Sequence, residues 1–146
     1  MELRDNWLGR WLAALSMPAL YFGLTAALVL ASIAYYEYGT YLLIQQRTDG
    51  REPLLNLAER QAAYFAAHQR FTADLTELGY TAVGNQSVAT PQGFYRLVVT
   101  AADDQGYSLA AIPNGEQMAD TACGILTLDF QGMAKSAKGA AASSCW

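Results

Sequence analysis

Few side chains in this sequence are of the types that build a catalytic or metal-binding site. The chain has one histidine, His68, with no second metal ligand at a suitable spacing. Asp103 and Asp104 precede Gln105-Gly106, which is typical of a turn and not of a cation site. No glycine-rich phosphate loop follows a predicted strand, and no nucleophile is paired with a base. We therefore predict that the protein is not an enzyme and has no catalytic residue, metal ligand or cofactor.

The two cysteines, Cys123 and Cys145, are the remaining chemically reactive pair. Both lie in the part of the chain that the topology below places outside the cytoplasm. An even pair in an oxidising compartment most simply forms a disulfide. A bridge that closes 21 intervening residues stabilises a domain by about 3 kcal/mol in the chain-entropy model. We expect a disulfide that holds the C-terminal loop.

The stretch that must anchor these residues is the uncharged run 11–36. It holds 26 residues, more than the roughly 20 needed to span a bilayer. Arg4 and Arg10 place the N-terminus in the cytoplasm. A cleaved signal peptide is the competing interpretation, but the run is longer than such a segment and continues into a helical pattern. Amphipathic rings flank both ends of the run, as at headgroup depth: Trp7, Trp11, Tyr35, Tyr36, Tyr38 and Tyr41.

Small residues at a spacing of four give the membrane run one narrow face. Gly23, Ala27 and Ala31 would let another helix approach closely. The alternative is that glycine and alanine are simply common in membrane helices, and the sequence leaves both interpretations open. The whole chain then divides into a cytoplasmic tail (1–10), a transmembrane helix (11–36), an amphipathic continuation of that helix (37–69) and a globular head (70–146).

Beyond the membrane the apolar period is helical. Leu54, Leu57 and Phe65 recur on one face, together with Ala58 and Gln61. We predict that this helix ends near His68 or Gln69 and that the three large apolar residues pack on the sheet that follows. Pro53 is expected to kink or restart the helix.

The last third of the sequence changes to the period of β-strands. Strands are predicted over 95–100, 107–112 and 125–130, with turns at 103–106 and 113–115. Residues 70–91 are expected to be a connection with local turns, and the tail 135–144 to be held only by its cysteine. Short connections favour an antiparallel meander, and the helix must cover one face of it. The predicted fold class is α+β.

Charge argues against most nucleic-acid binders. The net charge is -4, and residues 51–146 hold six Lys/Arg and nine Asp/Glu. No basic stripe is evident. The charge therefore argues against DNA capture, which would need Arg96, Lys135 and Lys138 on one face.

These elements, with several motifs, resemble those of type IV pilins, and among them the PilE-type minor pilins. Residues 32–38 resemble the family's exit from the membrane, and LLNLAERQ (54–61) is similar to its LLELAxRQ helix. The most specific motifs lie in the last third: GFYRL (93–97), YSLAAIP (107–113), Gln117, Asp120, CGILTLD (123–129), Gly132 and the terminal Cys145-Trp146.

The resemblance implies a structural, minor pilin-like subunit. Its expected partners are other pilin subunits, the pilus assembly machinery and inner-membrane lipid. The expected location is the bacterial inner membrane, single-pass, with a cytoplasmic N-terminus, a periplasmic head and occasional entry into the surface pilus. The alternatives are a displayed binding module, such as an adhesin or a DNA-uptake receptor pilin, and a pseudopilin-like protein of type II secretion.

The start of the chain departs from the family pattern. Ala14-Leu15 stands where the family has its Gly-Phe cleavage pair, and Ala19 stands where it has a glutamate. In the family that carboxylate pairs with the terminal amine of a neighbouring subunit, and a carboxylate at bilayer depth is costly unless it has such a function. We expect the N-terminus to remain uncleaved and the protein to stay mainly in the inner membrane. The alternative is a wrong start site or wrong opening codons.

Overall fold

The computed structural model describes residues 17–82, 86–137 and 142–146. Two compact units divide the chain, residues 1–39 and residues 40–146. The long helix α2 (Met17–His68) contributes to both, so the unit that contains the sheet includes the second half of the helix. Tail residues 1–10 and the positions Ala14 and Leu15 lie outside the described residues.

The first unit, as far as it is described, is an apolar helix whose side chains are exposed. Its large side chains, such as Leu24, Leu28 and Ile33, are exposed, and so are Ala19, Ala27 and Ala31. The hydroxyl of Ser32 donates to the carbonyl of Val29 at 2.7 Å, which satisfies it within the helix. By length and composition α2 is able to cross a membrane, since it contains an apolar stretch with a mean hydropathy of 1.7. A segment that crosses a bilayer must pair its polar groups internally, because the hydrocarbon offers no hydrogen-bond partners.

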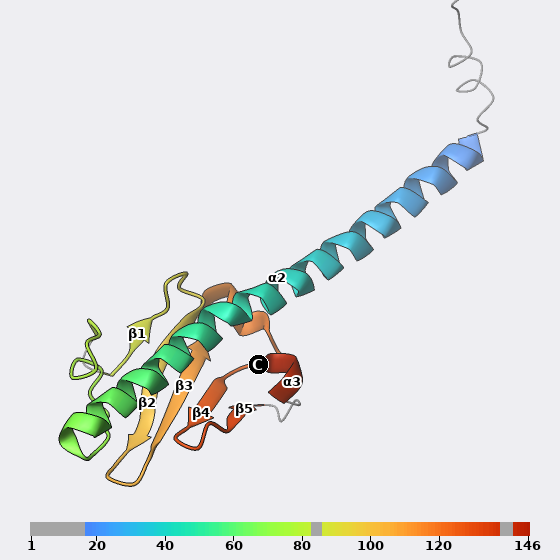
Figure 1. The fold of residues 1–146 in the computed structure, drawn as a ribbon. Helices are drawn as coiled ribbons and strands as arrows, with labels where there is room; N and C mark the ends of the chain where they lie inside the picture. The colour runs from blue at the N-terminus through green and yellow to red at the C-terminus, as the bar shows by residue number, and fades with distance from the viewer. Residues whose placement is uncertain (1–16, 83–85, 138–141) are drawn as a thin grey trace, which may run out of the picture. The chain divides into compact units, whose positions relative to one another are not determined.

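The second unit is a helix packed on an antiparallel sheet (Figure 1). Within the described residues five strands follow one another in sequence order, so the sheet is a meander. The strands are β1 (Val88–Ala89), β2 (Tyr95–Ala102), β3 (Tyr107–Pro113), β4 (Leu126–Asp129) and β5 (Ala134–Ser136). Between β3 and β4 lies the 3-10 helix η1 (Gly115–Ala119), and the short helix α3 (Ala142–Cys145) precedes the C-terminus. The predicted α+β fold is confirmed.

The core lies between α2 and the inner face of the sheet. Leu54 and Leu57 are fully buried there, because they lie three residues apart on the face of α2 that meets the sheet. The residues that the sheet contributes to this core are Tyr95, Leu97, Leu109, Ala111, Leu126 and Leu128. Gly50 lets the helix approach closely, since a Cβ at this position would come within 3.0 Å of the Tyr95 ring.

Phe65 lies at the margin of this core and not in its centre. Its ring is half-buried and stacks on Phe71 at 4.6 Å, and Phe71 in turn meets the edge of Tyr107 at 5.0 Å. Because α2 ends three residues later at His68, the partner of Phe65 is the following loop and not the centre of the sheet.

Three sequence expectations about the course of the backbone are wrong. The helix does not restart at Pro53: α2 runs through this residue without a break, since the packing of Leu54 and Leu57 outweighs one lost hydrogen bond, while a kink there stays a prediction. Strands β1 and β5 were not predicted, because two or three residues are too short to show a period. The tail is not held by Cys145 alone: β5 pairs with β4, and the indole of Trp146 donates to the carbonyl of Lys135 at 3.1 Å.

The buried Gln61 leads to the first mutational prediction. Its side-chain amide is fully buried, donates to the carbonyl of Thr72 at 2.6 Å and accepts from the amide of Thr72 at 3.2 Å. Gln61→Met keeps the length but leaves both backbone groups unpaired, so we expect a loss of about 2–4 kcal/mol in the free energy of unfolding. Urea denaturation of the full chain in detergent micelles, followed by near-UV circular dichroism, measures it. The exposed Gln45→Met is the matched control, and equal midpoints for both variants would refute the prediction.

Candidate functional site

An ion pair joins the helix to the C-terminal part of the head. Arg47 donates from Nε to one carboxylate oxygen of Asp120 at 2.7 Å and from Nη2 to the other at 3.0 Å. Its third nitrogen, Nη1, donates to the carbonyl of Ser144 at 2.9 Å. The Asp120 side chain is only 3% exposed and that of Arg47 only 11%. This two-pronged geometry is the strong form of a charged hydrogen bond.

Gln117 and Tyr95 extend this ion pair into a buried network. The amide nitrogen of Gln117 donates to the Tyr95 hydroxyl at 2.9 Å, to Asp120 at 3.2 Å and to the carbonyl of Leu43 at 3.2 Å. Burial, more than any other cause, raises the pKa of Tyr95 to about 12, so this hydroxyl stays protonated. Burial acts to raise the pKa of Asp120 as well, but the hydrogen bond and charge of Arg47 outweigh it and the pKa is lowered.

A second buried carboxylate holds the turn between β1 and β2. Asp49, on α2, accepts from the Thr90 hydroxyl at 2.5 Å and from the backbone amides of Gln92 and Phe94 at 3.0 and 3.1 Å. Asp49 is 6% exposed, and no cation among the described residues pairs with it. Its function is to fix the turn against the helix.

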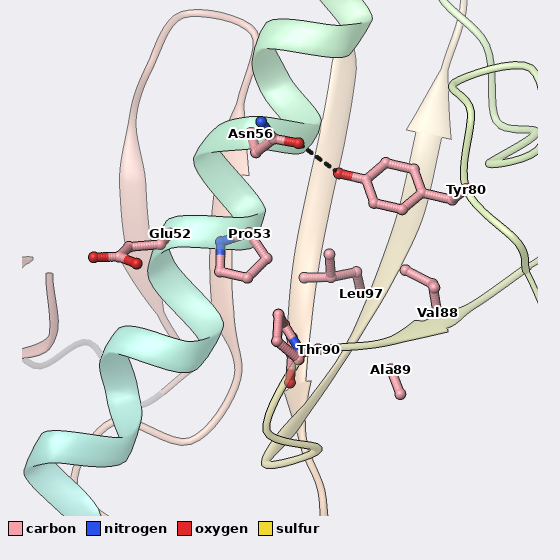
Figure 2. A pocket seen from close by; sticks show the side chains of 9 residues that line it. Glu52, Pro53, Asn56, Tyr80, Val88, Ala89, Thr90 and Leu97 are labelled. Atoms are coloured by element: carbon pink, nitrogen blue, oxygen red, sulfur yellow. Dashed lines mark hydrogen bonds between the residues drawn. The ribbon is translucent and has the colours of Figure 1, made fainter.

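A pocket of about 500 Å³ opens between α2 and the edge strand β1 (Figure 2). Its lining is mostly apolar, with Leu97 and Val88 on the sheet side, and the Tyr80 hydroxyl donates to the Asn56 side chain at 3.1 Å. The exposed carboxylate of Glu52 belongs to the same lining. A pocket of this size suits a small apolar group, while the negative charge of Glu52 disfavours phosphate.

The outer face of the sheet, opposite α2, carries two basic side chains. Arg96 lies between the buried Tyr95 and Leu97, Lys135 lies between the half-buried Ala134 and the buried Ser136, and both cations are exposed. Neither forms an ion pair with another described residue. Three strand spacings separate them, about 14 Å at ~4.8 Å each. Lys138, which DNA capture would also need on this face, lies outside the described residues.

The histidine, the Asp103–Asp104 pair and the two cysteines all have structural surroundings in the folded head. The His68 ring stacks on Tyr64 at 4.1 Å on the exposed end of α2. Asp103 accepts from the amides of Gln105 and Gly106 at 2.7 and 2.9 Å, so this segment is a turn. Within the described ranges no three His, Cys, Asp or Glu side chains come together as a metal site. Cys123 and Cys145 are joined in a disulfide, with their Cα atoms 5.6 Å apart.

Sequence reasoning missed the roles of Arg47, Asp49 and Thr90. Asp120 and Gln117 entered it only as parts of a family motif. The available signal was a pair of opposite charges, Arg47 and Asp49, that follows the uncharged residues 38–46. A sequence pattern alone does not tell whether such charges face solvent or the core.

Comparison with known proteins identifies a family for this chain. Residues 37–127 match the model of the family described as "Type IV minor pilin ComP, DNA uptake sequence receptor". A type IV pilin from Shewanella oneidensis, solved at high resolution, is similar at 22% sequence identity and a TM-score of 0.45, over 68% of this chain and 97% of that chain. A search of curated proteins found no match. Because the family model covers more than half of the chain, the protein belongs to the type IV minor pilin ComP family.

Proposed function

We propose that the protein is a minor subunit of the type IV pilus that α2 anchors in the inner membrane, with a cytoplasmic N-terminus and a periplasmic head. The family match over residues 37–127 carries the proposal. Two further observations support the topology. The exposed apolar helix is long enough to span a bilayer. The Cys123–Cys145 disulfide fits a head that is exported to an oxidising compartment.

The topology is tested by fusing alkaline phosphatase, which needs its own disulfides, after Trp146. We expect an active fusion that remains with the membranes after extraction at alkaline pH. A matched fusion to a fluorescent protein that matures only in the cytoplasm should stay dark. An inactive phosphatase with a bright fluorescent fusion would contradict the proposed orientation.

We also propose that the N-terminus is retained and that the protein enters pili rarely. Support comes from Ala19, which brings no carboxylate to pair with a neighbouring subunit, and from Ala14-Leu15 at the place of the family's cleavage pair. Lateral contact would then rely on Gly23, Ala27 and Ala31. Terminal peptide sequencing of membrane and sheared-pilus fractions decides this. A methylated chain that begins near Leu15 and is abundant in pili would contradict it.

A second candidate function is DNA capture on the outer face of the sheet. The family description names a DNA uptake sequence receptor, and this face carries the exposed Arg96 and Lys135. Their separation of about 14 Å is comparable with the ~12 Å width of the major groove, so the two cations suit phosphates on opposite sides of it. The rest of the head is acidic, and the pocket beside β1 contains Glu52.

The assay for DNA capture is fluorescence polarisation with labelled duplexes and the full chain in neutral detergent. A fragment that starts at Arg51 is unsuitable because it lacks Arg47 and Asp49, which hold the head together. We expect weak binding whose logarithm falls with the logarithm of salt concentration at a slope of about 2, as two phosphate contacts require. Arg96→Gln with Lys135→Gln should abolish it, and Arg70→Gln should not. Equal binding by all variants would exclude this face.

A further inference from the structure

One guanidinium group contacts the two segments of chain that meet at the disulfide. We call them the first arm, which contains Asp120 and Cys123, and the second arm, which contains Ser144 and Cys145. Arg47 binds Asp120, three residues before Cys123, through two of its nitrogens. Its third nitrogen binds the carbonyl of Ser144, immediately before Cys145. The arms are 22 residues apart in sequence, yet one side chain of α2 holds both.

Each arm has further contacts that do not involve sulfur. On the first arm, the amide of Cys123 donates to the Asp120 carboxylate at 3.3 Å. On the second arm, the amide of Ala137 donates to Ile125 at 2.9 Å, and the Trp146 indole donates to Lys135 at 3.1 Å. The geometry around the two cysteines is therefore over-determined: the covalent bond and the contacts of Arg47 specify the same arrangement.

We propose that Arg47 is a positioning residue for the oxidation of Cys123 and Cys145, which assembles the loop before the disulfide forms. Arg47 does not touch either sulfur; it acts through Asp120 and Ser144. A chain whose cysteines are already neighbours has a higher effective thiol concentration than one whose loop is open, because the entropy of loop closure is already lost. The disulfide then fixes covalently an arrangement of the loop that non-covalent contacts have already formed.

The chemistry needs a disulfide-containing oxidant such as glutathione disulfide. The thiolate of one cysteine attacks a sulfur of the oxidant and releases one glutathione thiolate. The thiolate of the other cysteine then attacks the mixed disulfide and releases the second. Two protein thiols lose two electrons and two protons, and glutathione disulfide takes them up as two thiols. The second step is intramolecular, so it is the step that pre-positioning favours.

The test measures the equilibrium constant for oxidation of the reduced full chain by glutathione in detergent micelles, with acid quenching and mass spectrometry. We expect Arg47→Gln to lower this constant by about tenfold or more, since it removes charged hydrogen bonds to both arms. Gln61→Met, which weakens the head far from the loop, is the matched control and should change it by less than about threefold. Equal constants for Arg47→Gln and the parent chain would overturn the proposal.

A second readout does not depend on oxidation. In a Cys123→Ser, Cys145→Ser chain, the Trp146 indole proton should keep its native nuclear magnetic resonance position while Arg47 is present, and move to that of a free indole in Arg47→Gln. A free-indole position with Arg47 intact would refute pre-assembly. If Arg47→Gln fails to fold even when oxidised, Arg47→Lys is used instead. Lysine can bind Asp120 but cannot reach Ser144 at the same time. The equilibrium constant for oxidation of Arg47→Lys should therefore lie between that of the parent chain and the at least tenfold lower value expected for Arg47→Gln. A constant equal to that of the parent chain would again overturn the proposal.

Discussion

Replacing Arg47 by alanine is expected to lower the free energy of unfolding of the head by about 3–5 kcal/mol. The change leaves the Asp120 carboxylate, whose side chain is 3% exposed, without its cation. The side chain of Gln117 and the backbone amides of Cys123 and Ala122 remain as donors to that carboxylate, and none of them carries a charge. An unpaired buried charge is one of the few single-site defects of this size. Urea denaturation of the full chain in micelles, followed by near-UV circular dichroism, measures the loss.

A double-mutant cycle separates the ion pair from other effects of Arg47→Ala. Asp120→Ala alone should also destabilise, because it leaves the Arg47 guanidinium poorly paired. Arg47→Ala with Asp120→Ala should be more stable than the sum of the two losses predicts, since neither charge is then left alone. Arg70→Ala, at an exposed position, serves as the control and should stay within about 0.5 kcal/mol of the parent. A coupling energy near zero would mean that the pair contributes nothing beyond its separate parts.

The same ion pair predicts how stability depends on acid. The pKa of Asp120 lies below its ordinary 3.8 in the folded head, because Arg47 outweighs the effect of burial. A depressed folded pKa contributes stability that is fully present above the unfolded value and is lost as pH falls through the folded one. The parent chain should therefore lose stability more steeply below about pH 4 than Asp120→Asn does. Asp104→Asn, at an exposed site, is the control, and parallel curves for the parent and Asp120→Asn would contradict this.

Periodicity explains why the helix and three of the strands could be predicted. Leu54 and Leu57 repeat at helical spacing, and Tyr95 and Leu97 alternate with exposed residues, so local pattern and burial agree. Phe65 satisfies the same helical period but is only half-buried, because α2 ends before the sheet can cover it. Periodicity identifies the face of a helix and not how far along that face the partner extends.

The polar contacts could not be predicted because they depend on which distant residues meet. Arg47 and Asp120 are 73 residues apart, and Asp49 and Thr90 are 41 apart. Each of these four residues can be identified in the sequence as charged or polar, but the sequence does not distinguish a buried charge from a solvated one. The sheet edges were missed for a different reason: β1 is held by the turn that Asp49 anchors and not by a period of its own. Local periodicity thus predicts the core of the head, whereas hydrogen bonds between distant residues determine the edge strands of the sheet.

Asp49→Ala is expected to cost about 3–4 kcal/mol and to release the turn between β1 and β2. The carboxylate accepts from the Thr90 hydroxyl and from the amides of Gln92 and Phe94, and hydrogen bonds to a charged group contribute about 1.5–3 kcal/mol each. Removing a buried charge recovers part of this sum, so the expected loss is below the full total. The turn carries β1 into register with β2 through Val88 and Leu97, so the loss should extend to the edge of the sheet.

Hydrogen exchange distinguishes local release from a general loss of stability. In Asp49→Ala the amides of Gln92 and Phe94 should exchange faster than those of β3, whereas a general loss would accelerate both alike. Asp49→Asn should be intermediate in stability, since it keeps one acceptor oxygen but turns an amide group toward the donors of the turn. The exposed Asp104→Ala is the control and should change the free energy of unfolding by less than about 0.5 kcal/mol. A similarly small change in Asp49→Ala would mean that water replaces the carboxylate, and that the turn is held by the Thr90–Tyr95 contacts alone.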